Sequence, residues 1–185
     1  MKKCLIIFEM LLLVCLSSCK EEEPGSLIPD IYTGIGNAEK NGDSWSALCR
    51  TQLSVDSTRF SIVLDTYSEE GYWRESLGIG GILPIFEKQK FELFDGSNSS
   101  ITSSSYGTLL DDGDVLGDYY ILDTTSIFNF VRITDYSSQN TEIQGIFSVS
   151  LVLEREGNQT PGKAPEKLVF SEGTFTVKVD PEWFE

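Results

Sequence analysis

The stretch IQGIFSVSLVLE, residues 143–154, decides the fold class because its side chains alternate between apolar and polar. Four large apolar residues fall on one face of this segment and two serines fall on the other, which is the period of a strand with one buried face. The segment GTFTVKV, residues 173–179, alternates in the same way. Residues 157–162, with the sequence GNQTPG, are rich in turn formers. The pattern therefore predicts two antiparallel strands joined by a loop.

Further runs of β-branched and aromatic residues recur at short spacing from residue 44 onward, separated by clusters of Ser, Asp and Gly. About nine or ten such segments, without a helical period, predict one all-β domain over residues 44–185. We expect an antiparallel β-sandwich, with a closed lipocalin-like β-barrel as the alternative. The clearest of the other predicted strands are Phe60–Leu64, Phe91–Phe94, Tyr119–Leu122 and Ile127–Ile133.

The N-terminus has the order of a secretory signal peptide: two lysines, an apolar run over Leu5–Leu16, and small residues up to Cys19. The run is too short for a transmembrane helix, which needs about 20 apolar residues. Leu16-Ser17-Ser18-Cys19 resembles the lipobox of bacterial lipoproteins. The resemblance implies that residues 1–18 are removed and that Cys19 is acylated; a secreted protein cut elsewhere is the alternative.

Residues 19–43 are acidic and contain scattered Pro and Gly, which is typical of a flexible linker. As a coil, Lys20–Asp43 would span about 27 Å. Lys20-Glu21-Glu22-Glu23 is similar to the surface-export signal of Bacteroidetes lipoproteins, and this implies an outer-membrane lipoprotein displayed on the cell surface. The alternative is an ordinary charged tether on the periplasmic face.

The composition excludes several kinds of chemistry. The chain has no histidine, which excludes Ser-His-Asp and Cys-His hydrolases and His-ligated zinc. Removal of residues 1–18 would change the net charge from −15 to −16 and leave Cys49 as the one cysteine beyond Cys19. We expect no nucleic-acid partner and no cofactor, and membrane contact through the acyl chains alone. Cys49 is expected to be a small buried apolar residue.

Four carboxylates on one glycine-containing segment are the best candidates for a metal site. Carboxylate oxygens suit Ca²⁺, although the spacing is not that of an EF-hand. Asp112-Gly113 is also a common hairpin turn, and we favour a solvated turn without metal. The candidate ligands are Asp111, Asp112, Asp114 and Asp118.

Surface aromatic residues could stack on sugar rings, although a β core also needs aromatic residues. The candidates for such a platform are Tyr67, Tyr72, Trp73, Tyr106, Tyr119 and Tyr120. We therefore expect a binding module for a glycan or a partner protein rather than an enzyme. The alternatives are a periplasm-facing structural lipoprotein and a carboxylate-pair glycan hydrolase, which needs two carboxyls about 5 to 10 Å apart. Its candidate acids are Glu69, Glu70, Glu75 and the acids of residues 111–118.

Three short motifs resemble those of a family of Bacteroidetes surface lipoproteins with a lipobox and a single all-β domain. They are Asn41-Gly42-x-x-Trp45-x-Ala47, Ile143-x-Gly145-x-Phe147 and Gly173-x-Phe175-x-Val177, and they cover residues 41–179. These motifs carry strand and turn residues, so the resemblance implies the fold and no activity. Two Asp-Ser/Thr-Thr segments are also similar to the O-glycosylation acceptor of exported Bacteroidetes proteins, with Ser57 and Thr124 as the modified residues.

Overall fold

The structure is a computed structural model that describes residues 28–53, 58–93, 101–157 and 163–179. These residues form one all-β domain, which confirms the predicted fold class. The described strands are β1 (Gly34–Lys40), β2 (Asp43–Leu53), β3 (Phe60–Tyr67), β4 (Trp73–Ile82), β5 (Gln89–Lys90), β6 (Ser103–Leu110), β7 (Val115–Leu122), β8 (Phe130–Ser137), β9 (Glu142–Arg155) and β10 (Lys167–Lys178).

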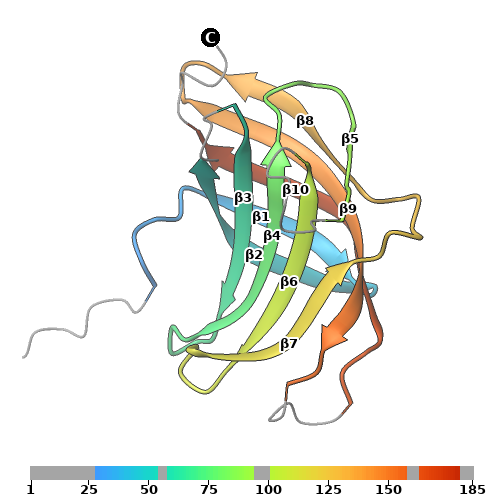
Figure 1. Ribbon diagram of the computed structural model, residues 1–185. Coiled ribbons are helices and arrows are strands. Elements are labelled where there is room, and N and C mark those ends of the chain that lie inside the picture. The colour runs from blue at the N-terminus through green and yellow to red at the C-terminus, as the bar shows by residue number, and fades with distance from the viewer. Residues whose placement is uncertain (1–27, 54–57, 94–100, 158–162, 180–185) are drawn as a thin grey trace, which may run out of the picture.

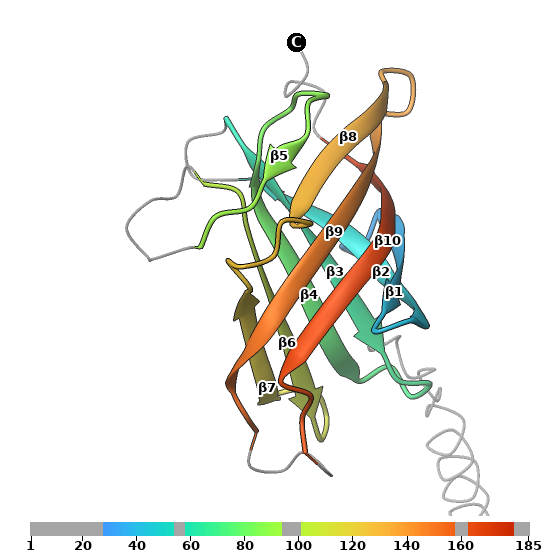
Figure 2. The ribbon, with the colours of Figure 1, turned by 90° about the vertical axis from the view of Figure 1, so that its right-hand side faces the viewer.

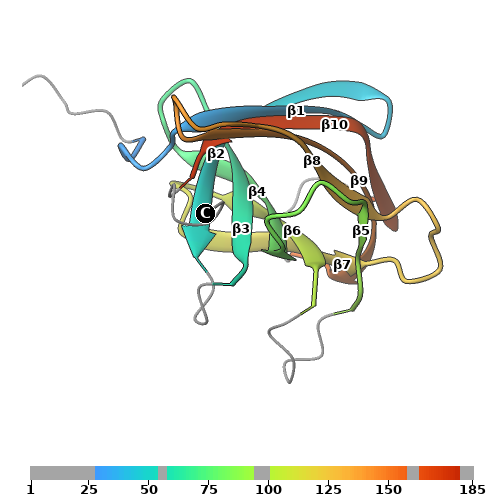
Figure 3. The ribbon, with the colours of Figure 1, turned by 90° about the horizontal axis from the view of Figure 1, so that it is seen from above.

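Eight of the strands close into an antiparallel barrel in the order β10-β1-β2-β3-β4-β6-β7-β9, and β9 pairs back with β10. Figure 1 shows the barrel from the side, and Figure 3 shows the ring of strands from above. The expected sandwich is therefore wrong and the alternative of a barrel is correct. The alternation of apolar and polar residues is the same in both architectures, so it could not separate them.

Residues 34–40 correct the predicted domain boundary, because they form β1 rather than part of a flexible linker. β1 pairs with β2 on one side and with β10 on the other, so it closes the ring. Its inward positions hold small residues: a Cβ on Gly36 would lie 2.2 Å from the Leu64 side chain. Small inward residues carry little hydrophobic signal, and the sequence pattern therefore missed this strand.

The long strand β9 changes partner along one of its edges. Glu142–Ser148 pair with β8, whereas Leu151–Arg155 pair with β7. The two-residue strand β5 then pairs with β8 at Phe130 and Val131. Figure 2 shows β8, β9 and β10 running side by side with β5 beyond β8. Beyond β9, the sheet is therefore continued by β7 at one end of the barrel and by β8 and β5 at the other end.

Three buried polar residues connect the segment between β7 and β8 to β9, at the point where β9 changes partner. The Asp123 amide donates to the Ser150 carbonyl at 2.8 Å, and the Ser150 amide donates to Asn129 Oδ1 at 2.7 Å. Asn129 Nδ2 donates to the Asp123 carbonyl, also at 2.7 Å. These bonds replace the ladder bonds that the strands do not supply here, because buried backbone groups need partners.

Large side chains fill the interior of the barrel, as expected for eight strands. Phe147, Phe170 and Phe175 come from β9 and β10, and Tyr106 and Tyr120 come from β6 and β7; all five are almost completely buried. A Cβ on Gly173 would lie 2.6 Å from the Phe147 ring. That glycine follows a bulge in the β9–β10 pairing, so the ring occupies space that a larger residue would need.

Gly78, Gly80 and Gly81 lie in β4 next to a bulge in its pairing with β3. The register between β3 and β4 shifts between the pairs Phe60–Ile82 and Ile62–Ile79. Gly81 has a φ of +68°, and a Cβ there would lie 1.9 Å from the Ile101 carbonyl oxygen. The segment is a close backbone approach within a strand.

Candidate functional site

Two adjoining hollows lie on the outside of the barrel, one on each side of Tyr67, and together we call them the groove at Tyr67. The first measures about 320 Å³ and is lined by residues 46–48 and 65–68 together with Ile28 and Ile35. The second, which we call the aromatic hollow, measures about 380 Å³. Both volumes lie near the lower end of the range for small-molecule sites. The aromatic hollow is lined by Pro29, Tyr67, Gly71, Tyr72, Trp73 and Asp112.

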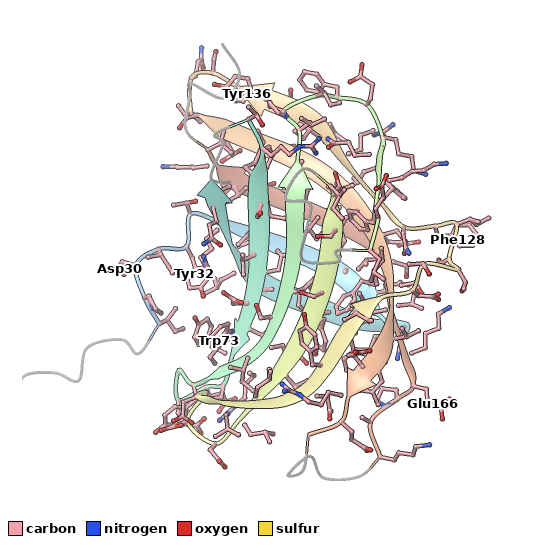
Figure 4. All side chains as sticks on the ribbon, viewed as in Figure 1. Asp30, Tyr32, Trp73, Phe128, Tyr136 and Glu166 are labelled. Carbon is pink, nitrogen blue, oxygen red and sulfur yellow. The ribbon has the colours of Figure 1, made fainter. Side chains whose placement is uncertain are left out.

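The segment before β1 packs against the barrel wall beside these hollows. The Tyr32 hydroxyl donates to Asp65 Oδ2 at 2.6 Å and lies 2.6 Å from the Tyr67 hydroxyl. The two tyrosine rings pack edge to face, with centroids 5.8 Å apart. The Thr33 amide also donates to the Cys49 carbonyl at 3.1 Å. Figure 4 shows Asp30 and Tyr32 on the same side of the barrel as Trp73. The groove therefore joins segments that are far apart in the sequence.

Asp65 is the buried charge beneath the groove, with 1% of its surface exposed. It accepts hydrogen bonds from Tyr32 and from Trp73 Nε1, the latter at 3.2 Å, and its Oδ2 lies 3.6 Å from Arg50 Nε. Burial and the hydrogen bond to Asp65 raise the pKa of Tyr32, so this hydroxyl stays protonated at neutral pH. The cluster holds Tyr32, Tyr67 and Trp73 in place.

Two hairpin turns meet at the aromatic hollow. Gly113 has a φ of +93°, and a Cβ there would lie 2.9 Å from the Trp73 amide nitrogen, so the β6–β7 turn packs closely on the start of β4. Arg74 donates to the Asp111 carbonyl at 2.6 Å, and its guanidinium lies 5.5 Å from the centre of the Tyr72 ring. These contacts place Asp112 at the edge of the hollow.

The predicted aromatic platform is only partly assembled. Tyr67, Tyr72 and Trp73 line one hollow, whereas Tyr106 and Tyr120 point into the barrel and belong to its core. Tyr119 lies elsewhere on the wall, in a hollow of about 450 Å³ whose other described lining residues are Leu116, Glu154 and Arg155. The groove at Tyr67 is therefore where three of the candidate platform residues come together.

The four candidate calcium ligands do not converge. Asp111, Asp112 and Asp114 lie in or next to the β6–β7 turn, whereas Asp118 is buried and accepts a hydrogen bond from the Gly157 amide at 2.8 Å. A hydrogen bond with Asp112 and its negative charge raise the pKa of Asp114. Within the described ranges, no group of three or more acidic or sulfur ligands is arranged to hold a metal ion.

The candidate acids of a hydrolase lie in different surroundings. Glu69 and Glu70 sit on the exposed turn between β3 and β4. Glu75 instead accepts hydrogen bonds from Lys40 and from the indole of Trp45. The Lys40 ammonium also donates to the Tyr106 hydroxyl at 3.3 Å. The charge of Glu75 is thus paired with that of Lys40 next to the core, whereas the two turn acids are exposed.

The remaining predicted residues are placed as follows. Cys19, Lys20–Glu23 and Ser57 lie outside the described residues. Thr124 is exposed next to the buried Asp123. Cys49 is completely buried in the core, as predicted, and burial raises the pKa of its thiol to about 12. At neutral pH this thiol is therefore protonated and unreactive.

Sequence reasoning missed Pro29, Tyr32 and Asp65. The first two lay in the segment interpreted as a linker, and Asp65 occupies an ordinary polar position of an alternating strand. Nothing in the sequence indicates that Tyr32 covers Asp65, because the contact joins residues on separate segments.

The fold and the groove together define an all-β barrel with an aromatic-lined hollow on its outer wall. No family model, curated protein or solved structure matches the chain. A helix with the length and apolarity of a membrane span is not found among the residues that the structure describes.

Proposed function

We propose that this protein is a lipid-anchored outer-membrane lipoprotein that displays its barrel at the cell surface and binds a glycan in the groove at Tyr67. The aromatic hollow carries the proposal. It brings three aromatic side chains to one recess of about 380 Å³, and 37% of the Tyr72 surface is exposed. Aromatic rings present a flat apolar face that suits the C–H face of a sugar ring.

The adjoining hollow supports a ligand longer than one ring. Tyr67 lines both recesses, and the first also offers polar groups from Ser46, Thr66 and Ser68. A linear glycan that crosses Tyr67 would stack in one recess and form hydrogen bonds in the other. A few polar groups beside apolar contacts are what orient a ligand in such sites.

The anchor and the address rest on the N-terminal sequence. Acylated Cys19 would hold the protein in the outer membrane, and Lys20–Glu23 would direct it to the cell surface, with the periplasmic face as the alternative. We propose no catalysis, since Glu75 is paired with Lys40 and Asp118 is buried and bonded to the Gly157 amide. The other candidate acids lie on exposed turns. A partner protein is the second class of ligand, because exposed aromatic residues also serve protein interfaces.

A glycan array tests the proposal. The purified lipoprotein in detergent micelles should bind a subset of oligosaccharides, and Tyr72→Ala should weaken that binding. Tyr119→Ala is the matched control, because it removes a ring from a different part of the wall. Binding that is equally lost in both variants, or absent for every glycan, would contradict the proposal.

A further inference from the structure

We propose that the aromatic hollow binds a positively charged group of the ligand, either a protonated amine or a quaternary ammonium. This inference rests on the proposed function and deepens it, because it names the chemistry that one part of the glycan must carry. Two independent features of the hollow support it: the rings that line it and the charges that surround it.

The aromatic side chains that line the hollow are of the kind that binds cations. Tyr67, Tyr72 and Trp73 contribute three rings to one recess. The face of an aromatic ring attracts a cation within about 6 Å of its centre. One such contact already exists here, since the guanidinium of Arg74 lies 5.5 Å from the centre of the Tyr72 ring. The hollow itself leaves room for a second, compact cation.

The surrounding charge has the matching sign. Residues 68–74 and 111–114 form the turns and strand start around the hollow, and they carry five carboxylates against the single cation Arg74. Asp112 itself lines the recess. Asp112 and Asp114 are close enough to share a hydrogen bond, so these turn carboxylates are crowded. A cation entering the hollow would relieve this repulsion, whereas a uronate or sulfate group would increase it.

Two sources of the cation fit the same chemistry. One is an amino sugar with a free amine, and the other is a choline-type substituent, which keeps its charge at every pH. An N-acetylated sugar has nearly the same ring without the charge. These three chemistries therefore separate a site for cations from a site for sugar rings.

Calorimetric titration of the full lipoprotein in micelles tests the inference. The probes are a glucosamine oligosaccharide, its N-acetylated counterpart of equal length, and choline. We expect the amine form, choline or both to bind, and the amine form to bind between about 2-fold and 30-fold more tightly than the acetylated form. Amine binding should also weaken above the pKa of the sugar amine, while choline binding should not.

Asp112→Asn should weaken cation binding, and because Asp112 lies on an exposed turn this variant should stay folded. Tyr72→Leu should weaken it as well, with melting curves to confirm folding, and Tyr119→Leu should leave it unchanged. If the acetylated form binds as tightly as the amine form, the inference is wrong and the glycan function stands. If choline binds and neither oligosaccharide does, the cation site stands with a choline-type group as its source, and the glycan array decides the proposed function. If no probe binds, the inference fails, and the glycan array still decides the proposed function.

Discussion

The Lys167 ammonium lies 2.7 Å from Oδ2 of Asp123, and this ion pair links the start of β10 to the end of β7. Asp123 Oδ1 also accepts hydrogen bonds from the amide and the hydroxyl of Thr125, at 3.0 and 2.6 Å. These bonds to the charged form hold the pKa of Asp123 well below its usual range. The carboxylate therefore stabilises the fold at the point where β9 changes partner.

We expect Asp123→Asn to lower the free energy of unfolding at pH 7 by about 1–3 kcal/mol, because it weakens a buried hydrogen-bonded network. The pKa of Asp123 is lower in the folded than in the unfolded state, so its contribution is present above about pH 4 and is lost as the pH falls. Urea unfolding from pH 7 down to about pH 2 measures this, because most of the loss occurs below the usual pKa of a free carboxyl group. The exposed Asp43→Asn is the control, and a deficit that is equally large at about pH 2 and at pH 7 would contradict the argument.

Asp114→Asn is expected to have the opposite effect. The pKa of Asp114 is raised by Asp112, so its ionisation opposes folding, and the associated loss of stability appears as the pH rises through the raised pKa. The variant should therefore melt at a higher temperature than the natural protein at pH 7, and this gain should disappear near pH 3. Asp30→Asn is an exposed control. A lower melting temperature at pH 7 would show that the turn needs this carboxylate, as a calcium site would, and melting in millimolar Ca²⁺ would then test for the ion.

Cys19→Ala should release the protein from membranes, because acyl chains supply the proposed anchor. Fractionation of cells measures the released portion. Cys15→Ala, within the expected signal peptide, should leave the protein membrane-bound. A mature protein whose peptide map still contains residues 4–18 would mean that the chain is not cleaved before Cys19.

Surface display predicts that protease added to intact cells digests the barrel. Alanine at residues 20–23 should protect it, because these residues form the proposed export signal. Alanine at Glu69 and Glu70 removes two acids from the barrel instead and should not protect it. Digestion only after lysis would place the natural protein on the periplasmic face.

Thr124 is expected to carry an O-linked glycan in the native host, since it is exposed and follows Asp123 in a segment similar to the O-glycosylation acceptor. A glycan there adds bulk and solubility at the surface. Peptide mass spectrometry should find added mass on this peptide, and Thr124→Ala should remove it. Thr134→Ala, at an exposed position of β8, should leave it in place. An unmodified peptide from native material would argue against this site.

Local patterns predicted the strands more accurately than the way the strands are arranged. The alternating segments 143–154 and 173–179 correspond to β9 and β10, which pair as expected. The apolar run at 127–133 misled, because β8 begins only at Phe130 and Phe128 is 68% exposed in the preceding loop. Figure 4 shows Phe128 at the side of the barrel opposite Trp73. Asn129 must reach Asp123 and Ser150, and this long-range requirement has no local signal.

The groove was predictable only in part for the same reason. Tyr67, Tyr72 and Trp73 are close in sequence and share one hairpin, so they could be proposed as a group. Pro29 and Asp112 come from distant segments, and only the closed ring and the packing of Gly113 on Trp73 bring them to the same recess. Residue types thus suggested the chemistry, whereas tertiary contacts decided which residues take part.

The pairing of β1 with β10, which we call the seam, determines when the barrel can close. Ile35 pairs with Thr176, so the ring closes through residues at the two ends of the domain. Such distant pairing carries a large loop-closure entropy and slows folding. A chain that is still being synthesised lacks β10, so it cannot complete the ring that the described strands form. The seam therefore leaves this ring open until residues 167–178 have been made.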